Sequence, residues 1–455
     1  MKKATNLIEL FKALVPSNFL GPNRDPEFYV KVYEDKLDTL RFSIQHDPNP
    51  QKTFYVTGQS GTGKTTALNF LPNKELEAEY TVVSMYTRDL LDLNDVDVVD
   101  LLLMTCYRLM QEETERASTR ELERLFGDRL DKIRDKQQGL IDETIEQEKK
   151  RAASAGGGVK AEVGTEVNPF VKFISLFKAS GNFFADFRMD NQYREITRRA
   201  FKLSKRELLE LTNKILEKFR ENVIRGKQLL LVFNELDHVK DLEQIRELFI
   251  ENRYYLENIA CKKIISIPVI LNIEGEFTLH GEIQEFGLKT LRNSLPEAAA
   301  RPQPEVDMNR QTLAQVAHQR VAEGSDLIAE DAIARAIDAS GGILRQFVTI
   351  LHYATRRAAM AKGECVSIND VNEAIGQLRG QMEPALIHGG RIAVLEHVRL
   401  EKKPNAPDNA EFLSALLSNQ VIIFHNDPAW YEVNPLIEKT VEIYARQRPD
   451  RPAIT

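Results

Sequence analysis

The sequence predicts an α/β protein, in which a doubly wound parallel sheet is followed by a helical lid domain and a C-terminal winged-helix domain. Three observations predict this architecture. Short apolar runs alternate with helical patterns through about the first 290 residues, four amphipathic helical segments follow a Pro-rich stretch, and a helix, two β-type runs and another helix come last. At about 150 residues per domain, a chain of 455 residues has room for all three parts.

Four candidate buried strands define the sheet, and each is too short, too apolar and too β-branched for a surface helix. They are Thr53–Thr57, Tyr80–Met85, Leu229–Phe233 and Ile264–Leu271. Because helical patterns lie between them, we expect the strands to run parallel, with helices as their connections. This domain is expected to span residues 51–292, after an N-terminal helical segment over residues 1–50.

The second and third strands are separated by about 140 residues, far more than the usual connection of about 2–6 residues. We therefore expect a helical insertion over about residues 110–200. Its apolar residues recur at near-helical spacing beside a densely charged face: Leu122, Phe126, Leu130, Ile133, Leu140 and Ile145. A Gly/Ala/Ser-rich stretch at 152–164 predicts a loop. The Phe-rich segment that follows, Phe170–Phe187, has two interpretations: packing in a core or subunit contact, or contact with a membrane surface.

A Pro-rich stretch at 296–310 marks the next boundary. Four helical segments follow and predict a small lid domain over residues 305–381, in which Ser367 and Asp370 form an N-cap arrangement. From about Met382, a helix, two β-type runs around an Asn-Asp-Pro turn and a final helix predict a winged-helix domain over residues 382–445.

Composition places the chain among ordinary globular proteins. Hydrophobic residues make up 42% and charged residues 28%, and a net charge of −7 argues against a chain that binds polyanions over its whole surface. Cys106, Cys261 and Cys365 lie far apart, which fits buried thiols in a reducing compartment better than disulfides or a zinc site. Without a run of ~18 apolar residues, the chain is expected to be cytoplasmic, with no integral membrane part.

The strongest motif is GQSGTGKT, Gly58–Thr65, which completes the pattern GxxxxGK[ST] after a strand and before a helix. Such a P-loop turns its backbone N–H groups inward at phosphate oxygens, its lysine adds a point charge, and its last hydroxyl meets Mg²⁺. The alternative is a Gly-rich turn without a nucleotide. The predicted nucleotide-binding residues are Gly58, Gln59, Ser60, Gly61, Thr62, Gly63, Lys64, Thr65 and Thr66.

A second segment, Leu229–Asp237, is a buried strand that ends in acidic residues and looks like a Walker B segment. At the carboxyl end of such a strand, an acid holds the water shell of Mg²⁺ and a neighbouring Glu can activate the attacking water. Asn234 occupies the usual Asp position, so we expect Mg²⁺ to be held by Thr65 and, through water, by an uncharged amide, with slow turnover. Glu235 is the predicted general base. In the alternative interpretation, Glu235 and Asp237 merely begin the next helix.

With these two segments the chain resembles the AAA+ ATPases, and within them the branch of replication initiators and related bacterial P-loop regulators with a C-terminal winged helix. Asn272, after the run IISIPVIL, matches the family's sensor of the γ-phosphate, and Arg345 in SGGILRQF matches its second sensor on the lid. Arg253 is the best-placed candidate for the arginine that this family supplies from a neighbouring subunit. For both arginines the alternative is a solvated side chain on a helix.

The resemblance implies ATP and Mg²⁺ as ligands and assembly into a homo-oligomer; it also associates such regulators with anti-phage or mobile-element systems. The partner of the winged helix stays open between DNA and an effector protein or intramolecular packing. Its hairpin carries Asp427 and Glu432 and no Lys or Arg. Basic residues lie only on either side of the hairpin: Arg391, Arg399, Lys402, Lys403, Arg446, Arg448 and Arg451.

Two functions follow from this sequence. The first is an ATP-hydrolysing switch that regulates a DNA or protein partner, with ATP ordering the lid through Lys64, Asn272 and Arg345. The second is a nucleotide-locked scaffold with little hydrolysis, which docks an effector protein. A DNA-loading initiator in the strict sense is disfavoured by the acidic hairpin and the mild net acidity.

Overall fold

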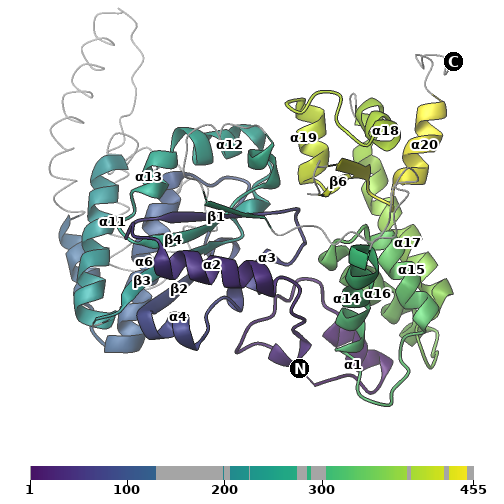
Figure 1. Cartoon of the computed structure of the whole chain (residues 1–455), viewed down its shortest axis with the longest axis horizontal. Helices are drawn as coiled ribbons and strands as arrows, with labels where there is room; N and C mark the ends of the chain where they lie inside the picture. The colour runs from purple at the N-terminus through teal and green to yellow at the C-terminus, as the bar shows by residue number, and fades with distance from the viewer. Residues whose placement is uncertain are drawn as a thin grey trace, which may run out of the picture.

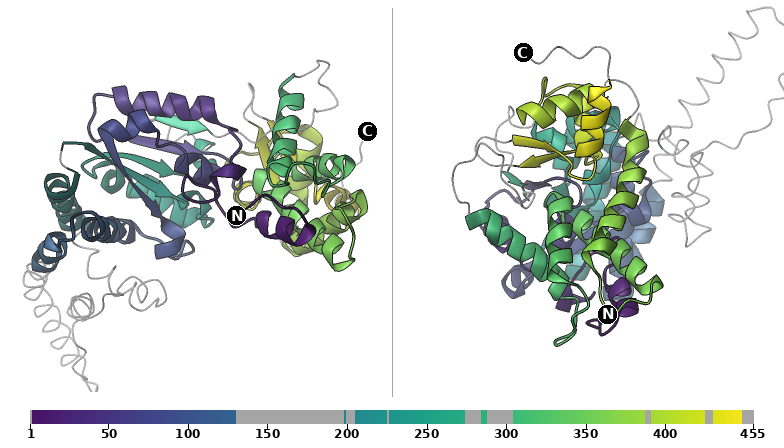
Figure 2. Two further views of the ribbon diagram at one scale, coloured as in Figure 1. Left: turned by 90° about the horizontal axis from the view of Figure 1, so that it is seen from below. Right: turned by 90° about the vertical axis from the view of Figure 1, so that its right-hand side faces the viewer.

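The computed structural model describes residues 2–129, 198, 205–224, 226–273, 284–287, 304–386, 391–424 and 430–447. In these ranges an α/β part lies beside a mostly helical part, and the N-terminal segment runs to both of them (Figure 1; Figure 2). No helix in the described ranges has the length and apolar character needed to span a membrane.

The sheet has five parallel strands in the order β2-β3-β4-β1-β5. They are β1 (Thr53–Thr57), β2 (Tyr80–Tyr86), β3 (Gln228–Asn234), β4 (Lys262–Ser266) and β5 (Gln284–Gly287). In register, Tyr55 of β1 lies opposite Ile265 of β4 and Glu285 of β5. The predicted α/β class with a parallel sheet is therefore confirmed.

Helices cover both faces of the sheet, as the alternation of its buried side chains requires. Phe54 and Val56 pack with α2 (Glu34–His46), α3 (Lys64–Asn69) and α4 (Lys74–Glu79). Tyr55 points to the opposite face and joins the larger core that includes the helices and turns of that side. These are α5 (Thr87–Leu90), α6 (Val98–Ala117), α11 (Lys205–Phe219), the π-helical turns η2 (Arg220–Ile224) and η4 (Glu247–Glu251), η3 (Leu236–His238), α12 (Leu242–Arg246) and α13 (Arg253–Glu257).

Two details of the sheet differ from the sequence prediction. The strand expected over Ile264–Leu271 ends at Ser266, because Pro268 has no N–H for the ladder, and Val269–Asn272 forms a 3-10 turn, η5. The fifth strand, β5, was not predicted. As a four-residue strand at the sheet's edge, it pairs only with β1 and has no long apolar run to reveal it.

The expected helical insertion begins later than residue 110. Helix α6 runs without a break through that position to Ala117 and packs against α11 on the sheet. Leu122 and Phe126, in the helical stretch 121–129, are buried in the same core. The remaining predicted positions of the insertion lie outside the described residues: Leu130, Ile133, Leu140, Ile145, the loop at 152–164 and Phe170–Phe187.

The N-terminal segment expected to be helical over residues 1–50 contains two α-helices with a crossing stretch between them. Helix α1 (Leu7–Ala13) packs on the lid, where the ring of Phe11 stacks on His352 at 4.2 Å between centroids. Residues 14–33, with one 3-10 turn, η1 (Pro26–Phe28), then cross to the sheet, where α2 begins at Glu34. This crossing segment, Leu14–Tyr33, is termed the strap below.

The lid consists of four helices in the predicted places: α14 (Pro304–His318), α15 (Glu330–Ser340), α16 (Leu344–Met360) and α17 (Ile368–Met382). Ser367 and Asp370 form the predicted capping box at the start of α17, each side chain bonding to the other's backbone N–H. Residues 296–303 of the predicted Pro-rich boundary lie outside the described residues, and 304–310 form the start of α14 instead of a linker. Of the three free cysteines, Cys106 and Cys261 are buried as expected, whereas Cys365 is exposed.

The last described part follows the turn η6 (Glu383–Leu386) and has the predicted order of helices and strands. It contains α18 (Arg391–Glu401), α19 (Ala410–Leu417), the antiparallel strands β6 (Val421–Phe424) and β7 (Trp430–Val433), and α20 (Glu438–Arg446). Residues 391–424 and 430–447 are termed the C-terminal module below. Its hairpin turn at 425–429 lies outside the described residues.

A glycine contact joins the lid to the C-terminal module. Gly341 ends α15 in the left-handed region, with φ +56°, and a Cβ atom there would lie 2.3 Å from Cδ1 of Ile422 and 3.0 Å from Cδ of Pro435. Two reciprocal hydrogen bonds between the amides of Gln346 and Asn434 reinforce this interface.

Replacing Gly341 by Ala should therefore destabilise the protein by about 1–3 kcal/mol, because the new methyl group displaces Ile422 and strains the backbone. Gly376 in α17 is the matched control, since nothing lies within 4 Å of its Cβ position and Gly376→Ala should stabilise by about 0.5–1 kcal/mol. Thermal unfolding of the two variants measures both effects. Equal melting of Gly341→Ala and the unchanged protein would contradict the packing of the module on the lid.

Candidate functional site

The P-loop follows β1 at the carboxyl edge of the sheet and ends at the first turn of α3. Gly58, Gly61 and Gly63 have φ values of 148°, 89° and 99°, a region that glycine occupies without steric cost. Gly63 is the N-cap of α3, so the loop wraps directly onto the amino end of that helix. The chain thus builds the anion-binding backbone that the motif predicted.

The side chain of Lys64 is buried beneath this loop, with 4% of the residue exposed. Its Nζ donates to the carbonyl oxygens of Gly58 and Gln59 at 2.7 and 2.9 Å, and it pairs with Oδ2 of Asp237 at 2.9 Å. An ammonium group has three N–H donors, so each one has a partner here.

Asp237 is a site residue whose role the sequence interpretation missed. Burial raises the pKa of Asp237, but the charges of Lys64, His238 and Arg345 and the hydrogen bond from Lys64 together outweigh burial, and the pKa lies below its usual value. Burial lowers the pKa of Lys64, and Asp237 opposes that shift. The signal that could have found this pair is the second acid in Asn-Glu-Leu-Asp, two residues after Glu235 and close to the P-loop in any sheet of this order.

Glu235 is held in a strained conformation beside this pair. Its φ is +71°, which is rare for a residue with a side chain and is typical of functional sites. Burial raises the pKa of Glu235, and the charge of nearby Arg88 opposes the shift. A carboxylate with a raised pKa suits a general base. Glu235 is the N-cap of the three-residue turn η3, and Asp237 lies within that turn.

At the end of β3, Asn234 and Asp237 have buried polar atoms without hydrogen-bond partners among the described residues. They are both amide atoms of Asn234 and Oδ1 of Asp237. Such buried, unpaired atoms cost about 1–3 kcal/mol each, and they are compensated when water or a ligand binds.

These open atoms fit a hydrated Mg²⁺ ion held together with a nucleotide. Magnesium keeps several water molecules and takes few protein ligands, so an amide oxygen, a carboxylate oxygen and the hydroxyl of Thr65 are suitable partners. Among the described residues, no cluster of three or more His, Cys, Asp or Glu side chains could hold a metal ion by itself. The residues therefore suit a metal that arrives with phosphate groups.

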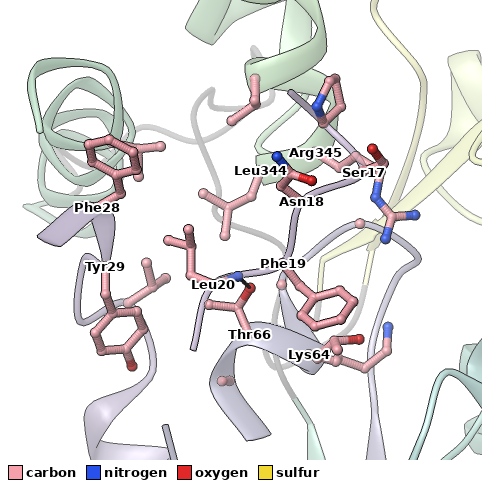
Figure 3. Close-up of a pocket in the computed structure, with 18 of the residues that line it drawn as sticks. Ser17, Asn18, Phe19, Leu20, Phe28, Tyr29, Lys64, Thr66, Leu344 and Arg345 are labelled. Carbon is pink, nitrogen blue, oxygen red and sulfur yellow. Dashed lines mark hydrogen bonds between the residues drawn. The ribbon is translucent and has the colours of Figure 1, made fainter. Parts of the chain in front are cut away.

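A cavity of about 370 Å³ extends from the P-loop between the sheet, the lid and the strap. Lys64 and Thr66 line it on one side, and Leu344 and Arg345 of the lid line it on the other (Figure 3). Thr65 also belongs to the lining. Its size suits a small organic ligand such as a nucleotide.

The apolar half of this cavity comes from the strap, which the sequence interpretation did not assign to the site. Figure 3 shows Phe19, Leu20, Phe28 and Tyr29 around it, and all four belong to the cavity lining. Tyr29 stacks on Phe70 at 3.7 Å between ring centroids. The available signal was an aromatic, non-periodic stretch between two helical patterns, which names no ligand on its own.

The predicted sensor arginine, Arg345, lies in the cavity lining and is not on an isolated helix surface. Its backbone N–H donates to the carbonyl of Gly61 at 2.9 Å, so the start of α16 rests on the P-loop. A Cβ atom at Gly61 would lie 2.9 Å from Cγ2 of Ile343 and 3.0 Å from Cβ of Arg345. The glycine is therefore required by the lid as well as by the turn.

The other two predicted site residues are the sensor Asn272 and Arg253, the arginine expected at a subunit boundary. Asn272 ends η5, but its side chain lies outside the described part of the structure. Arg253 lies outside the cavity lining, and its Nε donates to Glu257 at 2.7 Å with only 18% of the side chain exposed. The interpretation of Arg253 as a solvated arginine is therefore wrong, because Glu257 holds it against the domain.

The nine predicted P-loop residues differ in whether they face the cavity. Gly61, Gly63, Lys64, Thr65 and Thr66 line the cavity. The side chain of Thr62 donates to the carbonyl of Gln59. Ser60 Oγ lies 3.3 Å from Nδ1 of His238, and the Gln59 side chain points into the C-terminal module, away from the cavity. A contribution of Gln59 to phosphate binding through its backbone N–H stays a prediction.

No family model matches the sequence, and no curated protein does. Solved structures similar to the chain include the ORC2 protein of Aeropyrum pernix (10% identity, 96% of this chain and 98% of that chain, TM-score 0.43) and a Walker-type ATPase of Pyrococcus abyssi (14%, 94% and 99%, 0.45). Cdc6p of Pyrobaculum aerophilum is another (12%, 96% and 98%, 0.40).

His238 gives the site a testable pH dependence. Burial lowers the pKa of His238 from 6.5 to about 4, so between these values the unfolded chain binds a proton that the folded chain does not. Stability is then lost as the pH falls from about 6.5 toward 4. The melting temperature should fall less steeply over this range in His238→Asn than in the unchanged protein. The exposed His46, changed to Asn, is the control, and identical pH profiles for all three would contradict the burial of His238.

Proposed function

We propose that this chain is an AAA+-like ATPase that binds ATP with Mg²⁺ between its sheet and its lid and acts as a molecular switch. One observation carries the proposal: a single cavity joins the P-loop at Lys64, the acidic turn at Glu235 and Asp237, and the lid residue Arg345. These are the parts that phosphoryl transfer to water requires, namely a cradle for phosphates, a base and cationic groups that stabilise charge.

The residues of the cavity have separate roles in this proposal. Lys64 supplies positive charge to the phosphates once it leaves its present partners. Glu235 accepts the proton of the attacking water, and Arg345 carries the nucleotide state to the lid. Asn272 and, from a neighbouring subunit of a homo-oligomer, Arg253 complete the predicted set. The aromatic side chains of the strap bury the apolar base of the nucleotide. They do not distinguish adenine from guanine, so adenine is favoured by the family resemblance alone.

Magnesium, when bound, would neutralise charge that develops on the phosphates. Thr65 would hold it directly and Asn234 through water, while Asp237, three residues after Asn234, has one carboxylate oxygen without a hydrogen-bond partner among the described residues. Because an amide brings no charge, we expect weak metal retention and slow hydrolysis. Strong binding without turnover is the outcome that would favour the alternative function, a nucleotide-locked scaffold.

For the partner, the C-terminal module favours a protein contact or packing within the chain over DNA. Three of the basic residues that could meet phosphates are already paired with carboxylates in the module: Arg391 with Glu411, Lys402 with Glu432, and Arg446 with Glu442. A winged-helix assignment, a cytoplasmic location and a role in anti-phage defence stay predictions.

Steady-state ATP hydrolysis with parallel ATP-binding measurements tests the proposal. Lys64→Ala should lose binding, because the loop then has no charge for the phosphates, and Glu235→Gln should bind ATP but lose turnover by about 10²-fold or more. Asn234→Asp should retain Mg²⁺ more tightly and hydrolyse faster than the unchanged protein, because it adds the missing charge.

Arg206→Ala, on the exposed face of α11, is the control and should behave as the unchanged protein. Tight ATP binding with no turnover in any variant would overturn the hydrolysing switch in favour of the scaffold. No ATP binding by the unchanged protein would overturn both.

A further inference from the structure

The side chain of Gln59 in the P-loop faces the C-terminal module instead of the nucleotide cavity. It is 1% exposed, although the position is variable in the motif and needs no particular side chain for phosphate binding. Its Nε2 lies 3.0 Å from the carbonyl of Leu416, 2.8 Å from Oδ1 of Asn419 and 3.0 Å from the carbonyl of Val421. Its Oε1 accepts from the N–H of Ile423 at 3.2 Å. All four partners belong to the C-terminal module.

A second bond runs the opposite way across the same interface. Asn419 donates from Nδ2 to the carbonyl of Ser60 at 3.1 Å, so each of the two amide side chains reaches the other part of the chain. Asn419 itself has φ +57° at the turn between α19 and β6, which aims its amide at the P-loop. The contacts of Gln59 and Asn419 are termed the latch below.

The latch lies at the end of α19, the helix that precedes the hairpin. Helix α19 packs against η5, the turn that carries Asn272, and five of its eight residues are buried: Phe412, Leu413, Ala415, Leu416 and Leu417. The C-terminal module therefore packs on two segments that are predicted to contact the nucleotide, the P-loop and η5. In this arrangement the packed face of α19 is inaccessible to a partner.

Gln59 also connects this interface to the phosphate-binding lysine. Its carbonyl oxygen accepts from Lys64 Nζ at 2.9 Å, while its side chain holds the module. Since the three N–H donors of Lys64 are all engaged, the lysine must give up a partner to bind a phosphate. Two of the three partners, Gly58 and Gln59, are backbone carbonyls of the loop that carries the latch.

We propose that Gln59 is a latch residue that holds the C-terminal module on the P-loop, and that binding of a nucleoside triphosphate at Lys64 releases the module. The device is autoinhibitory, because α19 becomes accessible only after release. The part that concerns nucleotide rests on the proposed function; the docking by Gln59 does not. Because the coupling is reciprocal, a variant whose latch is weakened must bind nucleotide more tightly than the unchanged protein.

Hydrogen–deuterium exchange of the full chain without nucleotide tests the docking. Gln59→Ala should speed exchange across residues 410–424 by about tenfold, because α19 and β6 lose their contacts with the P-loop. Asn419→Ala removes the other half of the latch from outside the P-loop and should act in the same direction. The matched control is Gln45→Ala, which removes a glutamine that bonds to Glu79 on α4. Unchanged exchange in both latch variants would overturn the proposal.

The nucleotide arm uses ATP with Mg²⁺ on the same proteins. ATP should speed exchange over 410–424 in the unchanged protein but not in Lys64→Ala, and Gln59→Ala and Asn419→Ala should both bind ATP several-fold more tightly than Gln45→Ala. Bound ATP that leaves exchange unchanged or slows it, or latch variants with weaker ATP binding, would overturn the release. If ATP does not bind the unchanged protein, the proposed function and the release fail, while the first arm still decides whether Gln59 docks the module.

Discussion

The site depends on one buried ammonium group. Lys64 lies beneath the P-loop and places its three N–H donors on two loop carbonyls and on Asp237. A buried charge without such partners would be costly, so these contacts hold the loop in shape when no phosphate is there. The same contacts decide what phosphate binding must change. A lysine with three partners can accept a fourth only by exchanging one of them, and each exchange moves part of the loop or frees Asp237.

Three parts of the chain contact the P-loop, and each contacts different residues of the loop. The strap and lid line the cavity at Gly61–Thr66, the acidic turn reaches Lys64 through Asp237, and the C-terminal module holds Gln59. Gly61 receives the start of α16 directly, through the bond from Arg345 to its carbonyl. In the proposed function, the occupancy of the loop and the positions of lid and module belong to one equilibrium, which would be the physical basis of a switch.

The parts of this arrangement that obey local rules could be predicted from sequence. The P-loop, three of the strands, the lid helices and the capping box at Ser367 follow from periodicity and motif spacing. What could not be predicted depends on contacts between distant segments. β5 is a short edge strand, the strap aromatics have no periodicity, and Asp237 reveals its role only beside Lys64. The side chain of Gln59 occupies a variable motif position, so its direction depends on a module more than 350 residues further along the chain.

A distance between the sheet and the C-terminal module tests the central claim most directly. Spin labels at Phe42 on α2 and Ile443 on α20 suit this measurement, since these side chains are 62% and 47% exposed, and Cys365→Ser removes the exposed native thiol. Pulsed electron resonance should give one narrow distance without nucleotide and a longer or broader distribution with ATP and Mg²⁺, a change that Lys64→Ala abolishes. The same narrow distance at saturating, bound ATP would contradict a single equilibrium that links the P-loop to the module.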